Sequence, residues 1–237
     1  MPINDVINGI KVAAELSGIQ SKITGTVRDI RHEMKRFGVD IAPGNQIIES
    51  WSEVFNAIDN KTYKDKFKIG DCIQCDFGKE GTVFMQIAAF DKDKLASDEG
   101  YAAITWVAKY CLAVKREMKE SGYWLPIITN KGGWKESDMR LALSDVKYEI
   151  DNTVRSRIAL VKKHNIQNDT NDYLWILSVD EYQQYKSNPN ISFSYNESFW
   201  LRDPKGGSDF YQVYPSGRIV PMFSSNKDGV LVCFCTN

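Results

Sequence analysis

The chain has 237 residues, of which 43% are hydrophobic and 26% are charged, with 30 basic and 31 acidic side chains. This composition is typical of a globular protein, and the balanced charge argues against a nucleic-acid-binding protein, which would carry a basic stripe. No apolar run approaches the ~20 residues that a membrane-spanning helix needs, so no membrane insertion is expected. The N-terminus lacks the apolar run of a signal peptide, which predicts synthesis in the cytoplasm.

Residues 1–66 are expected to form a helical assembly or docking segment. Apolar residues recur at helical spacing over residues 3–37, and from Leu16 to Phe37 they stand three or four positions apart, as in a coiled-coil seam. Such a seam either packs on its own domain or joins the chain into a dimer or trimer. A second helix is expected over residues 47–58, followed by a polar linker, "NKTYKDK", that ends near residue 66.

From residue 67 the pattern changes to strands and helices of a second domain, residues 67–237. "GDCIQCDF" and "GTVFMQIAAF", joined by "GKE", predict a β-hairpin. Ser97 or Asp98 is expected to cap a helix that runs to Met118, and Ser137 to cap another that runs to Ile150. "YLWILS" predicts a short buried strand and "VDEYQQY" a brief helix, after which the chain ends in short strands and loops. This order of elements predicts an α+β fold.

The cysteines indicate packing rather than chemistry. In a chain without a signal peptide, an odd number of cysteines is expected to be reduced and to pack as small hydrophobic side chains. They are Cys72, Cys75, Cys111, Cys233 and Cys235. Cys72 and Cys75 have the spacing of a zinc knuckle, but the sequence offers no second pair with the matching spacing.

Catalytic motifs are absent from the sequence. The two histidines, His32 and His164, stand outside any nucleophile context, and neither a G-x-S-x-G turn nor a phosphate-binding glycine loop occurs. The chain is therefore expected to be no enzyme and to hold no cofactor. Calcium stays open as an alternative, because Asp203, Asp209 and Asp228 lie in loops that are able to converge and calcium takes oxygen ligands.

Five sequence segments, in a fixed order, are similar to motifs of a known family: "IGDCIQCDF", "TNKGGWKESDMRLAL", "DYLWILSVDEY", "SFWLRDP" and "YQVYPSGRI". Together they resemble a family of gram-positive bacteria and their phages, marked by a G-G-W-x-x-S-x-x-R helix start, an L-W-x-L-S strand and a W-L-R-[SD]-P motif. The resemblance covers about residues 67–237 and implies a C-type-lectin-like fold, shared with formylglycine-generating enzymes, in which terminal loops bind the ligand. Asp203 stands where the family more often has Ser, and "GVLVCF" replaces its usual V-R-P-A ending.

The resemblance divides the candidate residues into two groups. Positions that match the motifs are expected to be structural: Trp134, Arg140, Trp175, Trp200 and Arg202. The turns after them are rich in Tyr, Ser and Asn, the residue types of many recognition surfaces. The candidate ligand-binding residues on these turns are Asp209, Tyr211, Tyr214, Arg218, Ser225, Asn226 and Lys227.

The segment from Trp51 to Ile58 is similar to leader segments of phage tail and fibre proteins. The combined resemblance implies a non-enzymatic virion protein that recognises a host-surface glycan or protein and forms a dimer or trimer through its N-terminal helix, beside other virion proteins. A structural virion component whose terminal face contacts neighbouring subunits is the first alternative. An oxidase of the formylglycine-generating kind, which would use Cys233 and Cys235, is the second.

Overall fold

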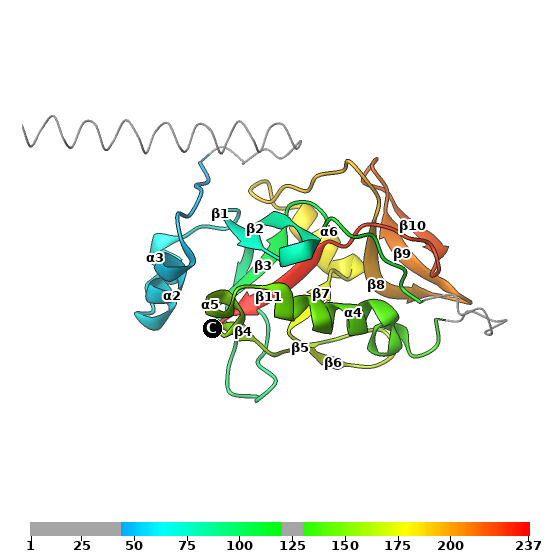
Figure 1. The fold of residues 1–237 in the computed structure, drawn as a ribbon, viewed down its shortest axis with the longest axis horizontal. Coiled ribbons are helices and arrows are strands. Elements are labelled where there is room, and N and C mark those ends of the chain that lie inside the picture. Colours follow the sequence, from blue (N-terminus) through cyan, green and yellow to red (C-terminus); the bar gives the residue numbers. More distant parts are fainter. Residues whose placement is uncertain (1–43, 120–129) are drawn as a thin grey trace, which may run out of the picture. The chain divides into compact units, whose positions relative to one another are not determined.

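The computed structural model describes residues 44–119 and 130–237. They belong to one compact unit, Ile41–Asn237 (Figure 1). This unit is a mixed α/β structure that consists mostly of strands, with one curled antiparallel sheet and smaller sheets beside it. The expected helix over residues 3–37 lies outside the described residues. None of the described helices is long and apolar enough to cross a membrane.

The segment before residue 67 is part of this unit. Helix α2 (Trp51–Asp59) is capped by Ser50 and is followed by the short α3 (Tyr63–Lys66). The ring of Trp51 lies 5.1 Å from that of Trp106 and 5.9 Å from that of Phe234, both in the main sheet. The predicted second helix is therefore present, but the domain boundary expected near residue 66 is not, because α2 packs into the same core.

The main sheet contains β1 (Cys72–Asp76), β2 (Thr82–Phe90), β3 (Ile104–Ala108), β11 (Val232–Thr236) and β4 (Ile158–Ala159), in that order, and β7 (Leu174–Ile176) also pairs with β11. The predicted hairpin of β1 and β2 is confirmed, with the 3-10 turn η1 (Gly78–Glu80) between the strands. The last strand, β11, lies inside the sheet between strands from three other parts of the chain (Figure 1). The chain end therefore completes the core.

The helix expected from Ser97 or Asp98 to Met118 is wrong, because the middle of this segment is strand β3. All five residues of β3 are buried, since it pairs with β2 on one side and with β11 on the other. Trp106 Nε1 donates to Thr236 Oγ1 at 3.0 Å across this pairing. A strand buried on both faces has no polar alternation, so its apolar run resembles a buried helix.

Two predicted helices are present in the middle of the chain, although the first ends at Val146 rather than at Ile150. Ser137 caps α4 (Asp138–Val146), and Ser178 forms a capping box with Glu181 at the start of α6 (Val179–Lys186). The region also contains η2 (Gly133–Glu136), η3 (Lys147–Glu149), α5 (Asn152–Arg155), β5 (Val161–Lys163) and β6 (Thr170–Asp172). The expected buried strand "YLWILS" is β7.

The terminal region forms a three-stranded antiparallel sheet of β8 (Phe199–Lys205), β9 (Asp209–Val213) and β10 (Ile219–Phe223). Phe210 and Gln212 face the core, whereas Tyr211 stands opposite Pro221 on the outer face. Strand β10 is the edge of this sheet, and a proline there removes one of the donors with which another strand would pair. The sheet thus has one buried face and one outer face, which is exposed at Pro221 and Phe223 and covered at Val213.

Candidate ligand-binding face

The helix-start motif is built around one buried carboxylate. Asp172 of β6 accepts from Trp134 Nε1 at 2.9 Å, from Thr170 Oγ1 at 2.6 Å and from Arg140 Nε at 2.6 Å. Ser137 accepts from the backbone N–H of Arg140 and so caps α4 within the same motif. The motif residues Trp134, Ser137 and Arg140 therefore fix the start of α4 against β6.

The W-L-R-x-P motif is likewise directed inward. Trp200 is fully buried, and its Nε1 donates to the carbonyl of Arg116 at 2.9 Å. Arg202 is 2% exposed and donates to the carbonyl of Ile176 at 3.0 Å, to Asn165 Oδ1 at 2.7 Å and to Glu181. These contacts join β8 to β7, α6 and the turn after β5.

A network of four buried or largely buried charges lies behind the terminal sheet. Lys163 Nζ lies 2.6 Å from Asp93 Oδ1 and 2.6 Å from Glu181 Oε1, and 4.3 Å from the centre of the buried Trp175 ring. Arg202 pairs with Glu181 from the other side. Burial alone would raise the pKa of Glu181, but Lys163 and Arg202 lower it overall. Burial alone would lower the pKa of Lys163, but its two carboxylate neighbours raise it overall.

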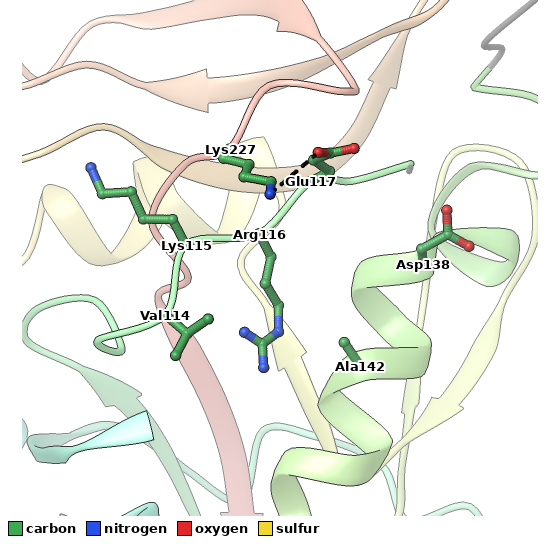
Figure 2. A pocket seen from close by; sticks show the side chains of 7 residues that line it. All are labelled: Val114, Lys115, Arg116, Glu117, Asp138, Ala142 and Lys227. Carbon is green, nitrogen blue, oxygen red and sulfur yellow. Dashed lines mark ion pairs between the residues drawn. The ribbon is translucent and has the colours of Figure 1, made fainter. Parts of the chain in front are cut away.

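An open hollow of about 510 Å³ lies where the segment before residue 119 meets the terminal turns and α4. It is lined by Val114, Lys115, Arg116, Glu117, Asp138, Ala142 and Lys227. Figure 2 shows the Arg116 guanidinium between Val114 and Ala142, and Lys227 near Glu117, at 4.0 Å between Nζ and Oε1. Because most of the lining side chains are charged, the hollow suits a polar ligand.

The walls of this hollow are held by backbone hydrogen bonds. The N–H of Arg116 donates to the carbonyl of Asp228 at 3.0 Å, and the N–H of Asp228 donates to the carbonyl of Arg116 at 3.1 Å. The N–H of Met118 donates to the carbonyl of Ser224 at 2.8 Å. On one wall, Arg116 Nη2 pairs with the buried Glu80 at 2.7 Å. Arg116 Nη1 is buried and has no hydrogen-bond partner within residues 44–119 and 130–237.

The structure divides the seven candidate ligand-binding residues between two ends of the terminal sheet. The turn Ser225–Lys227 and Asp209 lie at one end, where the N–H of Ser224 donates to the carbonyl of Ser208 at 3.1 Å. Tyr214 and Arg218 close the β9–β10 hairpin at the other end, where the N–H of Tyr214 donates to the carbonyl of Arg218 at 2.9 Å. The two ends are separated by the length of β9 and β10, which have five residues each and rise roughly 3.3 Å per residue. The seven residues therefore do not line one pocket.

Tyr211 lies between the two ends, on the outer face of the sheet. It stands opposite Pro221, and Phe223, which is 49% exposed, stands opposite Asp209. Lys205 lies over the Tyr211 ring at 5.8 Å from its centre. This outer face is thus partly aromatic, with charged residues at the Lys205 end.

Two of the three aspartates considered for calcium contact different parts of the chain. Asp203 is buried and accepts from the N–H of Val179 in α6, whereas the backbone of Asp228 pairs with Arg116. Within the described ranges no three His, Cys, Asp or Glu side chains gather as a metal-binding group.

All five cysteines are buried and form no disulfide. Burial raises the pKa of Cys72 to about 11 and raises the pKa of Cys233 and Cys235 well above the ordinary value. The thiolate is the reactive form of cysteine, so neutral buried thiols are inert. We expect no labelling of the native protein by a water-soluble thiol reagent at pH 7 and labelling of all five cysteines in denaturant. Rapid labelling of Cys233 or Cys235 in the native protein would instead favour the oxidase alternative.

Comparison with family models, with curated proteins and with solved structures found no match to this chain. The residues that sequence reasoning missed are buried or largely buried charged residues that contact the motif residues, Arg116 or one another. They are Glu80, Asp93, Lys163, Asp172 and Glu181, each of which is one of many charged residues in the sequence. Only the capping spacing from Ser178 to Glu181 offered a signal for one of them.

Proposed function

We propose that this chain is a non-enzymatic phage or prophage virion protein, associated with the tail or fibre, whose C-type-lectin-like domain recognises a host-surface glycan or protein. It is synthesised in the host cytoplasm and assembled with other virion proteins, as a dimer or trimer through its N-terminal helix. The motif resemblance over residues 67–237 supports this reading, together with the arrangement of the terminal turns.

The observation that supports recognition most directly is the turn Ser225–Lys227. Asn226 and Lys227 are exposed, whereas the backbone on both sides of them is anchored to the segment before residue 119. The turn also borders the charged hollow through Lys227. Exposed polar side chains on an immobilised turn lose little conformational freedom on binding, which favours specific recognition.

The test is adsorption of the purified full-length protein to a panel of gram-positive cell walls. We expect the double substitution Asn226→Ala and Lys227→Ala to weaken binding about tenfold or more, which corresponds to about 1.4 kcal/mol. Lys68→Ala, which removes an exposed lysine before β1, is the matched control and should leave binding unchanged. If the wild-type protein binds no wall of the panel, or if the double variant binds as well as wild type, recognition through this turn is wrong.

The second candidate function is a structural virion component, which the exposed Phe223 on the edge strand β10 favours. An apolar side chain on a sheet edge is suited to contact with a neighbouring subunit. In that case Phe223→Ser should prevent incorporation of the protein into virions, and the wild-type protein alone should not adsorb to cell walls. The two measurements therefore separate the two functions.

A further inference from the structure

We propose that Lys163 and Asp93 form an intramolecular amide bond, with Glu181 as the group that transfers the proton and Thr105 as the donor to the reacting carboxyl group. The product would be a permanent cross-link between β5 and the connection that joins β2 to β3. This inference is independent of the proposed function, because it rests only on the arrangement of these four side chains.

The amine and the carboxylate that would react are already in contact. Lys163 Nζ lies 2.6 Å from Asp93 Oδ1, and the two side chains are 4% and 7% exposed. Their backbones are held together, because the N–H of Lys162 donates to the carbonyl of Lys94 at 2.8 Å and Leu95 pairs with Val161. A nucleophile that is fixed against its electrophile reacts as if at a very high concentration.

Two further side chains occupy the positions that amide formation needs. Glu181 Oε1 lies 2.6 Å from Lys163 Nζ, where it can accept a proton from the amine. Thr105 Oγ1 donates to Asp93 Oδ2 at 2.6 Å, and Cys235 Sγ lies 3.5 Å from the same oxygen. These donors point at the oxygen on which negative charge develops when the amine attacks Cγ.

The reaction balances without any co-reactant. One proton passes from the Lys163 ammonium through Glu181 to Asp93, which gives a neutral amine and a neutral carboxylic acid. The amine then attacks Cγ of Asp93 and forms the C–N bond. Glu181 takes the second amine proton and delivers it to Oδ1, whose bond to Cγ breaks, so that Oδ1 leaves as water. The amide nitrogen keeps one hydrogen, Oδ2 becomes the amide oxygen, and Glu181 returns to its carboxylate form.

Electrostatics favours the product over the buried ions. Before the reaction Lys163 and Arg202 balance Asp93 and Glu181, and afterwards Arg202 still balances Glu181. The amide therefore removes two costly buried charges without leaving a third one unpaired. Because the resting proton lies on Lys163, the first transfer is uphill, and we expect the bond to form slowly after folding.

The experiment is intact-mass spectrometry of the purified full-length protein under denaturing conditions, when fresh and after prolonged incubation. We expect a species that is lighter than the sequence mass by one water molecule and that increases with time. Protease digestion should then yield the peptides that carry Asp93 and Lys163 as one joined species. Asp228 precedes Gly229 and is a second place where an aspartate can lose water by succinimide formation, so the digest must locate the change.

Two variants serve as controls for this assignment. Lys163→Arg keeps the charge but removes the amine, and Glu181→Gln removes the proton acceptor. Each variant should therefore show the mass calculated from its own sequence, with no loss of water. The cross-link restricts the unfolded chain between positions 70 apart, so the incubated wild-type protein should also melt at a higher temperature than Lys163→Arg. A wild-type protein that keeps its full mass after incubation, or loses water only at Asp228, would overturn the proposal. This outcome can be read from the wild-type protein even if a variant fails to fold.

Discussion

Replacing Arg202 with alanine should lower the free energy of unfolding by about 3–5 kcal/mol, because it removes one partner from a buried ion pair. The guanidinium is 2% exposed and donates to two carbonyls, those of Ile176 and His164, as well as to Asn165 and Glu181. Its removal takes the donor from the buried carbonyl of Ile176 and one of the two cationic partners from Glu181. Urea denaturation followed by tryptophan fluorescence measures the change.

Two further substitutions test the reason for that loss. Arg202→Lys keeps the charge but not the planar group that reaches several acceptors at once, so it should recover only part of the stability. Arg218→Ala removes an exposed arginine from the β9–β10 turn and should change stability by no more than about 0.5 kcal/mol. If Arg202→Ala unfolds at the same urea concentration as Arg218→Ala, the buried network does not stabilise the fold.

The sequence predicted those parts of the fold that depend on neighbouring residues. The β1–β2 hairpin follows from two apolar runs around "GKE", the start of α4 follows from Ser137 at a cap position, and α6 was expected directly after the buried strand. Each of these signals acts over a few residues, so it can be read without knowledge of the tertiary structure.

Strand β3 and the start of the compact unit could not be predicted in this way. The partners of β3 include Phe234, which pairs with Trp106, and Trp51 packs on the same pair from the other end of the chain. These contacts are set by the fold as a whole, so the helix expected from Ser97 or Asp98 to Met118 was wrong and the boundary near residue 66 was misplaced. Tertiary burial decides the state of such segments.

The same limit applies to the candidate face. The motifs marked Trp134, Trp200 and Arg202, but a motif does not state which carboxylate or carbonyl its residues meet. The division of the turn residues between two ends of the sheet follows from the register of β9 with β10, which a list of exposed residue types does not contain. Composition indicated a recognition surface, whereas the register determines which residues can contact one ligand together.

Replacing Asp172 with alanine should have an effect of similar size, a loss of about 3–5 kcal/mol, because this carboxylate is the common partner of the helix-start motif. Trp134 Nε1, Thr170 Oγ1 and Arg140 Nε all donate to it, and the indole is buried. Asp169→Ala is the matched control, since the side chain of Asp169 is 62% exposed and should contribute little.

A double-mutant cycle separates two costs of Asp172→Ala. One is the loss of the hydrogen bonds to the carboxylate, and the other is the buried Trp134 N–H that is left without an acceptor. Trp134→Phe keeps the aromatic ring but removes the N–H, so by itself it should cost about 1 kcal/mol or more, plus a smaller packing loss. In that background Asp172→Ala no longer leaves a buried indole N–H without an acceptor. Its cost should therefore be smaller by about 1–2 kcal/mol than in the wild-type protein. Additive costs would mean that Trp134 and Asp172 act independently, and that the motif spacing reflects packing of the indole rather than its hydrogen bond.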